Sequence, residues 1–557
     1  MSSPTSTTPD TSADGARGPA AAAIEAEARR RRSFAIISHP DAGKTTLTEK
    51  LLLYGGAIHL AGAVKAKGAA RHARSDWMEM EKERGISVST SVMQFDYQGR
   101  RMNLLDTPGH NDFSEDTYRT LTAADAAVML IDSVKGVEPQ TIKLFQVCRM
   151  RGIPVVTFIN KMDREGREPI ELLDEVETVL GIPCTPVNWP IGQGRDFQGV
   201  FDRWGHTVHW FEREGRGTRK AASHSAPIDD PQWSEHLGEA AYAKLKEDLE
   251  LLDAAGQAFD REAFLAGQQT PVFFGSAVTN FGVEPFLERF VDLAPAPRPR
   301  ATVEGAVEPE QPDFTGFVFK IQANMDPKHR DRIAFVRICS GRFERGMEVK
   351  HVRTGKKLAL NRPLQFLAQD RALVEEAWPG DIIGLWDPGM LRLGDALSER
   401  ADVEFEGLPR FSPEHFVRLK VKELSRRKQL EKGLDQLSQE GAVQLFYDRH
   451  QFEHFPMLGA VGVLQFEVLQ YRLESEYNVD VKLERQPWTV ARWVEGDFDP
   501  DEFERLFSTS RAVKDADDRW VALFESEWWL RRVMDKFPQL TFVAAVQPAR
   551  GGRAERK

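Results

Sequence analysis

The chain has 557 residues, which is too many for one hydrophobic core, so its length predicts roughly three domains. Its apolar share of 41% and charged share of 29% are ordinary for a globular protein, and its apolar runs are too short to span a membrane. A formal charge of −11 argues against indiscriminate nucleic-acid binding but leaves room for local basic patches. The three widely spaced cysteines lack metal-ligand spacing and are expected to be reduced thiols of a cytoplasmic protein.

The first 30 residues are predicted to form a disordered tail. They are rich in Ser, Thr, Pro and Ala without apolar periodicity. The basic run that follows is not succeeded by the apolar core of a secretory signal, and the acidic residues of the tail argue against an organelle transit peptide. The tail is therefore expected to take no part in the chemistry.

Residues 31–296 alternate apolar runs with amphipathic stretches. Strands are expected at residues 34–37, 102–105, 126–131, 154–159 and 271–274. Such near-continuous apolar runs predict an α/β domain with a doubly wound, mostly parallel sheet covered on both faces. The long interval before the last strand carries Trp204, Trp210 and Phe211 and predicts an extra packed subregion.

A phosphate-binding loop is predicted between the first strand and a helical stretch at residues 47–53, because loop amides and a helix N-terminus then point at one anion. Its residues are Ser38, His39, Pro40, Asp41, Ala42, Gly43, Lys44, Thr45 and Thr46. Lys44 is expected to neutralise the β- and γ-phosphates, and the Thr45 hydroxyl to bind Mg²⁺. Ser38 stands where the usual pattern has glycine, so either the loop turns without a positive φ there or Ser38 tolerates one.

A second motif, Asp106-Thr107-Pro108-Gly109-His110, follows the strand at residues 102–105. The carboxyl ends of strands form the ligand crevice of a doubly wound sheet. Asp106 is therefore expected to face Mg²⁺ through a bound water. Gly109 is expected to offer its amide to the γ-phosphate and to swing when that phosphate leaves. In isolation the motif equally fits an ordinary turn at the end of a strand.

Two further strand ends are predicted to recognise the base. Asp163, in Asn160-Lys161-Met162-Asp163, can accept hydrogen bonds from N1–H and the 2-amino group of guanine, and such pairing discriminates by about 10⁴-fold or more against a base without it. The methylenes of Lys161 can lie along the base plane. After the next strand, Ser276 and Ala277 can meet guanine O6 with free amides. The order of the four motifs, each after its own strand, predicts a GTP-binding domain.

The segment at residues 75–90 lies between the first two motifs and contains Ser87, a candidate Mg²⁺ ligand while γ-phosphate is present. Such a loop orders with triphosphate and loosens after hydrolysis. A charged surface helix would explain residues 77–82, but it gives no reason for Arg84-Gly85-Ile86-Ser87.

Two more domains are predicted after a Pro-rich linker at residues 293–300. Short strands with Gly turns predict a β-barrel domain at residues 304–402. Apolar spacing predicts an α+β, ferredoxin-like domain at residues 411–540, followed by a basic tail at 541–557. RNA contact and a solvated face are equally compatible with one set of cations in this domain: Arg418, Lys420, Lys422, Arg426, Arg427 and Lys428.

These motifs resemble those of the translational GTPases, and within them the bacterial release factor 3 family. The resemblance covers residues 33–484 and is carried by residues 38–46, 75–95, 106–123 and 160–163. It implies that His110 orients the attacking water and that hydrolysis is slow until RNA of the large ribosomal subunit reorders this histidine. It also places Asp41 at a position associated with a monovalent cation.

The function implied is that of a ribosome-dependent GTPase that drives class-1 release factors off the ribosome after peptide release. It would bind GTP, GDP and Mg²⁺ and is expected to be a cytoplasmic monomer without membrane contact. A translocase like elongation factor G is the alternative, but that family carries two further domains and too little chain follows Glu484. A module that holds GTP without hydrolysing it is a third possibility. The presence of His110, Lys44 and Thr45 argues against it.

Overall fold

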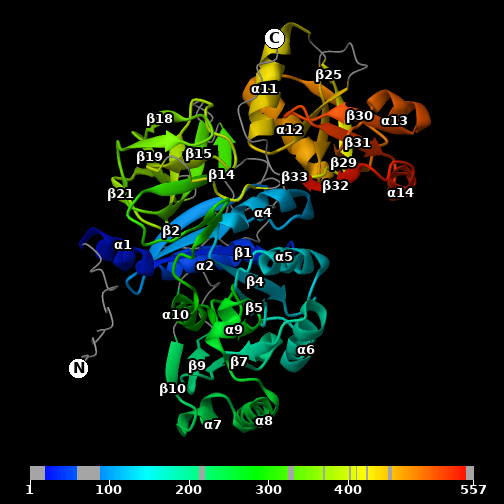
Figure 1. The fold of residues 1–557 in the computed structure, drawn as a ribbon. Coiled ribbons are helices and arrows are strands. Elements are labelled where there is room, and N and C mark those ends of the chain that lie inside the picture. The colour runs from blue at the N-terminus through cyan, green and yellow to red at the C-terminus, as the bar shows by residue number, and fades with distance from the viewer. Residues whose placement is uncertain are drawn as a thin grey trace, which may run out of the picture.

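The computed structural model describes residues 19–58, 88–212, 220–221, 223–323, 332–367, 370–400, 403–408, 410–421, 424–448, 455–507 and 509–546. Three bodies follow one another along the chain: an α/β domain coloured blue to green, a green barrel, and a yellow-to-red α+β domain (Figure 1). Among the described residues, no helix combines the length and apolar character needed to cross a membrane. The three cysteines are free, buried thiols, as predicted.

The sheet of the first domain has the order β2-β3-β1-β4-β5-β11-β6. Every neighbouring pair is parallel except β2 and β3. The bounds are β1 (Arg31–Ser38), β2 (Ser91–Tyr97), β3 (Arg100–Asp106), β4 (Ala126–Asp132), β5 (Val155–Asn160), β6 (Cys184–Pro186) and β11 (Thr270–Phe274). The five strands expected from apolar runs are confirmed; β2 and β6 are additional.

Helices cover both faces of this sheet, as the doubly wound pattern predicted. They are α2 (Lys44–Tyr54), α4 (Ser114–Ala123), α5 (Pro139–Met150), α6 (Pro169–Leu180) and α10 (Val283–Leu293). Alternate residues of β1 enter different cores: Phe34 and Ile36 pack in the cluster that contains α2 and α10, whereas Ala35 and Ile37 pack with α5 and α6. This alternation explains why β1 is apolar throughout, since neither of its faces meets water.

Residues 19–30 were predicted to be disordered, and this prediction is wrong, because they form helix α1 (Pro19–Arg30). The segment is rich in alanine, the strongest helix former. Ile24 and Ala28, one helical turn apart, are 4% and 3% exposed, and Arg30 Nε donates to Gly99 O at 3.3 Å. The helix is therefore held by tertiary contacts that composition does not reveal.

The extra subregion expected from the tryptophans is present between β6 and β11. It consists of an antiparallel sheet in the order β10-β9-β8-β7 with the long helix α8 and two short helices, α7 and α9. Its elements are β7 (Asn188–Ile191), β8 (Gly199–Asp202), β9 (Thr207–Phe211), β10 (Ser223–Pro227), α7 (Gln232–His236), α8 (Glu239–Ala255) and α9 (Arg261–Leu265). Trp189 and Trp233 lie in its core.

The second domain wraps antiparallel strands around one apolar core, as predicted for a β-barrel. A small hairpin of β12 (Arg300–Thr302) and β13 (Gly305–Val307) precedes it. Its strands are β14 (Thr315–Ala323), β15 (Arg332–Ser340), β16 (Phe343–Glu344), β17 (Glu348–His351), β18 (Lys356–Ala359), β19 (Pro363–Leu367), β20 (Asp370–Leu373), β21 (Glu376–Ala377), β22 (Ile382–Trp386) and β23 (Ala396–Ser398).

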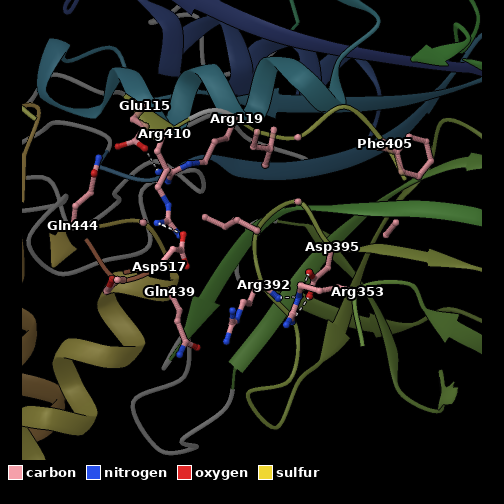
Figure 2. Close-up of a pocket in the computed structure, with 18 of the residues that line it drawn as sticks. Glu115, Arg119, Arg353, Arg392, Asp395, Phe405, Arg410, Gln439, Gln444 and Asp517 are labelled. Atoms are coloured by element: carbon pink, nitrogen blue, oxygen red, sulfur yellow. Dashed lines mark hydrogen bonds and ion pairs between the residues drawn. The ribbon is translucent and has the colours of Figure 1, made fainter. Parts of the chain in front are cut away.

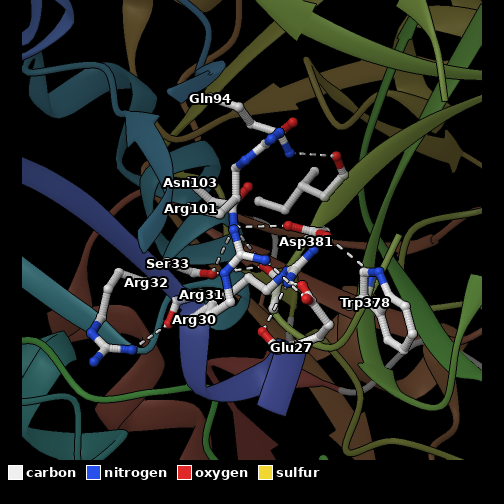
Figure 3. Close-up of polar contacts among 12 residues, drawn as sticks. Glu27, Arg30, Arg31, Arg32, Ser33, Gln94, Arg101, Asn103, Trp378 and Asp381 are labelled. Carbon is white, nitrogen blue, oxygen red and sulfur yellow. Dashed lines mark hydrogen bonds and ion pairs between the residues drawn. The ribbon is translucent and has the colours of Figure 1, made fainter. Parts of the chain in front are cut away.

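Buried polar contacts fasten this barrel to the first domain (Figure 3). Arg31 Nε lies 3.1 Å from Asp381 Oδ2, and Ser33 Oγ and Asn103 Nδ2 donate to Gly380 O at 2.7 and 3.2 Å. Gly380 has φ +105°, and a Cβ there would lie 2.8 Å from Arg31 Cβ. The junction therefore depends on close backbone approach as well as on charge.

The third domain has a β-α-β-β-α-β unit with sheet order β28-β25-β27-β26, the ferredoxin-like arrangement that was predicted. Its elements are β24 (Arg410–Phe411), β25 (His415–Val421), α11 (Arg427–Gln439), β26 (Gln444–Asp448), β27 (Met457–Ala460), α12 (Val463–Tyr477) and β28 (Val481–Arg485). Strand β27 was not expected from the sequence.

The C-terminal region continues the same sheet through β26 and β30. Its elements are β29 (Val490–Glu495), α13 (Pro500–Leu506), β30 (Ser510–Lys514), β31 (Trp520–Phe524), α14 (Glu527–Lys536), β32 (Thr541–Val543) and β33 (Ala545–Val546). The prediction of a basic tail from residue 541 is therefore wrong for residues 541–546, because β32 pairs with β29 and β33 pairs with β24.

Candidate nucleotide site

The predicted phosphate loop connects β1 to α2, and its turn is made after Ser38. Ser38 is the last residue of β1 and has no positive φ, whereas Asp41 and Gly43 have φ values of +66° and +102°. A Cβ at Gly43 would overlap Asn160 Nδ2, so the close approach of Asn160 requires glycine here. Successive left-handed and helical residues turn backbone amides into a concavity that suits an anion.

Lys44 and Asp106 form a buried ion pair beneath this loop. Lys44 Nζ lies 2.6 Å from Asp106 Oδ1. The second carboxylate oxygen, Asp106 Oδ2, is buried without a hydrogen-bond partner among the described residues. An orphaned carboxylate oxygen, on a residue paired with Lys44 at the start of α2, fits Mg²⁺ and its bound water, because Mg²⁺ prefers oxygen ligands.

Asn160 connects the phosphate loop with the loop after β11. Its Nδ2 donates to Ala42 O at 2.8 Å, and its Oδ1 accepts from Ala277 N at 2.9 Å. The amides of Ser276 and Ala277 were expected to be free, and this is wrong: Ser276 N donates to Phe281 O, and Ala277 N to Asn160. Both amides therefore donate within the protein, as buried backbone amides generally do.

Lys161 and Asp163 follow at the end of β5. Lys161 Nζ donates to Asp41 O and lies 2.6 Å from Asp132 Oδ2, so it ties the phosphate loop to the end of β4. Ser276 Oγ donates to Asp163 Oδ1 at 2.6 Å. Burial by itself raises the pKa of Asp132, but hydrogen bonds from Lys161 and from backbone amides, together with the Lys161 charge, hold that pKa below its usual value.

The Asp106–His110 motif lies against the phosphate loop. Thr107 Oγ1 donates to Ile36 O at 2.7 Å, and the Cβ direction of Gly109 faces the Pro40 backbone. The His110 side chain is 34% exposed and accepts at Nδ1 from Asp112 N at 3.2 Å, so it caps the 3-10 helix Asn111–Phe113. The candidate Mg²⁺ ligand Ser87 lies outside the described residues.

Two acidic residues of the site were not predicted. Asp132 ends β4 and holds Lys161, and Glu138 Oε1 lies 3.2 Å from His39 Nε2. Asp132 follows an apolar strand directly, which is the signal that identified Asp106, so this signal could have found it. Glu138 has no such signal, because only the fold brings it to His39.

The cations considered for RNA contact are largely paired within their own domain. Arg418 lies 3.4 Å from Asp448, Lys420 lies 2.6 Å from Glu484, and Arg427 lies 2.8 Å from Glu431. This pairing favours the interpretation that these cations lie on a solvated face over the interpretation that they bind RNA phosphates. Lys422 lies outside the described residues.

A cavity of about 780 Å³ lies elsewhere, between the three domains (Figure 2). Its arginines face carboxylates: Arg119 with Glu115, Arg353 with Asp395, and Arg410 with Asp517. These three pairs compensate the charges of the residues that form them.

Three family models match the chain in succession. They are the elongation factor Tu GTP binding domain at residues 29–296, elongation factor G domain 2 at 313–400, and the class II release factor RF3 C-terminal domain at 405–534. A crystal structure of a Thermus thermophilus protein is similar with a TM-score of 0.66 and 25% identity, covering 83% of this chain and 69% of that one.

Curated relatives match over nearly the whole chain. A peptide chain release factor 3 from Symbiobacterium thermophilum is 59% identical over 93% of this chain and 98% of its own length. One from Trichodesmium erythraeum is 56% identical over 93% of this chain and 96% of its own length. The chain therefore belongs to the peptide chain release factor 3 family, and it is a ribosome-stimulated translational GTPase that acts in termination.

Proposed function

We propose that the chain uses GTP binding and hydrolysis to promote dissociation of class-1 peptide chain release factors from the ribosome after peptide release. The observation that carries this proposal is the meeting of four strand-end motifs at one loop, through the Lys44–Asp106 pair and the two hydrogen bonds of Asn160. The similarity to proteins named peptide chain release factor 3 supports the choice among translational GTPases.

The phosphates bind at residues 38–46 and at the Gly109 amide. Lys44 leaves Asp106 for the β- and γ-phosphates, and loop amides together with the N-terminus of α2 bind their oxygens. Ser38 Oγ and His39 Nδ1 are buried without a hydrogen-bond partner among the described residues, so they are available to a ligand that enters this loop.

Mg²⁺ would be held by the Thr45 hydroxyl, by Ser87 and, through water, by Asp106. When bound, this ion neutralises charge on the phosphates. The family resemblance associates Asp41 with a monovalent cation, and the Asp41 carbonyl accepts from Lys161.

The guanine base lies between the end of β5 and the loop after β11. Asp163 accepts from the base, while Ser276 holds the other side of the carboxylate. Asn160 positions the phosphate loop relative to Ala277, and the Lys161 stem covers the base.

His110 orients the attacking water. Its Nδ1 is engaged by Asp112, which leaves Nε2 as the ring atom able to face a water at the γ-phosphate. Amides and Lys44 stabilise the charge that develops on the phosphoryl oxygens. Binding of the ribosome is what brings this histidine into position. The protein acts as a monomer in the cytoplasm.

The deciding experiment adds the purified chain to post-release ribosomes that carry a labelled class-1 release factor. We expect the factor to leave faster with GTP than with GDP, and messenger RNA to stay in register. Equal rates with both nucleotides would contradict the proposal, whereas movement of messenger RNA would support the translocase alternative.

A further inference from the structure

Asp112 contacts its near neighbour His110 and also Leu464, which lies 352 positions further along the sequence. Its Oδ1 lies 3.2 Å from His110 Nδ1, and its Oδ2 accepts from Leu464 N at 2.7 Å. Leu464 lies in the first turn of α12, so the second contact belongs to the third domain. One carboxylate thus joins the proposed water-orienting histidine to another domain.

The contact with α12 is shielded and electrostatically favourable. Phe113, Val88 and Val468 form a buried apolar cluster beside it, with Leu464 and Tyr471 packed against them. A carboxylate at a helix N-terminus is stabilised by unpaired amides and by the helix dipole. Exclusion of water strengthens such a hydrogen bond.

Gly462, the residue before α12, makes the fit steric as well. Its φ of −134° and ψ of 157° are extended values that any residue adopts. A Cβ at this position would nevertheless overlap Cα, Cβ and Cγ of Asp112. Glycine is therefore required by the approach of Asp112 and not by the local backbone.

We propose that Asp112 is a positioning residue that couples the seating of α12 to the orientation of His110. With α12 seated, the Leu464 amide holds the Asp112 carboxylate and thereby fixes the residue whose backbone amide donates to His110 Nδ1, which leaves Nε2 for the water. A residue that fixes the orientation of an imidazole raises turnover without touching the substrate. When α12 moves away, Asp112 loses its amide partner and His110 loses its fixed neighbour. The inference rests on the proposed role of His110.

The test compares Asp112→Ala with Gly462→Ala, which disturbs the junction from the third domain without changing the sequence of the loop that carries His110. Ribosome-stimulated GTP hydrolysis is measured against ribosome concentration to separate kcat from KM, and hydrogen exchange follows the Leu464 amide. We expect both variants to lower kcat about tenfold or more and to lose protection of that amide, while GTP affinity stays unchanged.

Glu474→Gln is the matched control, because Glu474 is an exposed carboxylate farther along α12. It should leave both readouts at the wild-type level. Thermal unfolding and GDP affinity first establish that each variant folds; should Asp112→Ala fail, Gly462→Ala alone decides. Faster exchange at Leu464 with an unchanged kcat in Gly462→Ala would overturn the coupling.

These outcomes are distinguishable from failure of the proposed function. If His110→Ala hydrolysed GTP on ribosomes as fast as the wild type, the role of His110 would be wrong. If His110→Ala were inactive but Gly462→Ala retained full kcat despite a displaced α12, only the coupling would be wrong.

Discussion

Lys44 Nζ and Asp106 Oδ1 lie 2.6 Å apart, with side chains only 7% and 1% exposed. The residue expected to bind phosphates is therefore paired with the residue expected to face the metal. Removing one partner of a buried ion pair lowers the stability of the fold, because the remaining charge has no solvent to stabilise it. Nucleotide binding must replace this partner for Lys44 with phosphate oxygens.

Lys44→Ala should weaken GTP binding by about 100-fold or more, since the phosphates lose their direct cation. It should also lower the free energy of unfolding of the nucleotide-free protein by about 3–5 kcal/mol, because Asp106 stays buried and unpaired. Equilibrium nucleotide titration and urea unfolding measure the two effects. The double variant with Asp106→Asn should regain much of the stability but none of the affinity. If Lys44→Ala and the double variant were equally unstable, the unpaired Asp106 carboxylate would not be the cause of the lost stability.

His110→Ala should remove most ribosome-stimulated hydrolysis, roughly 100-fold or more in kcat, because no imidazole remains to align the water. GTP affinity should be nearly unchanged, since His110 is not among the phosphate-binding residues. Single-turnover hydrolysis on ribosomes, with GTP binding measured separately, checks both statements. Wild-type turnover in this variant would exclude the assigned role.

Asp163→Asn should shift preference from guanine towards xanthine nucleotides. An amide can donate to the 2-oxo group of xanthine, whereas it cannot accept both guanine N–H groups as a carboxylate does. Competition between GTP and xanthosine triphosphate measures the change. Ser276→Ala serves as the comparison, since it removes the 2.6 Å hydrogen bond to Asp163 while keeping the carboxylate, and should preserve the guanine preference.

Lys50, in α2, gives a pH prediction. Burial lowers its pKa to about 8, against the opposing effect of the Glu49 charge. The folded pKa thus lies below the unfolded value of 10.5, so the unfolded chain binds more protons between these values and stability should rise with pH across that window. Below pH 8 the buried charge costs at most roughly 3 kcal/mol.

Lys50→Met should therefore be more stable than the wild type at pH 7 and should lose the rise in stability between pH 8 and 10. Urea unfolding at several pH values measures this. Lys428→Met, at an exposed position of α11, is the control and should keep the wild-type slope. An unchanged slope in Lys50→Met would mean that another group causes the pH dependence.

The phosphate and base motifs could be located from the sequence because each follows its own apolar strand. In a parallel sheet the carboxyl ends of neighbouring strands meet at one edge. Lys44, Asp106 and Asn160 were thus expected to lie together without knowledge of any contact. The same rule holds for Asp132, the last residue of β4.

Other features depend on contacts between distant segments. The α1 helix was missed because the burial of Ile24 and Ala28 depends on the tertiary structure and is not visible in the local composition. The strands after β28 were not predicted individually, because β30 pairs with β26, and β27, α12, β28 and β29 lie between them in the chain. The backbone amides of Ser276 and Ala277 likewise donate to partners that the local sequence pattern does not identify.

The sequence by itself determined the order of the domains, the doubly wound sheet and the residue types that meet at its carboxyl edge, because strand periodicity and loop chemistry are local properties. Only the tertiary structure decided which charges pair, as with Lys44 and Asp106, and which domain surfaces meet, as with Asp112 and Leu464. Such pairings require the chain to close long loops, and the partner is selected by packing of the whole fold and not by neighbours in the sequence.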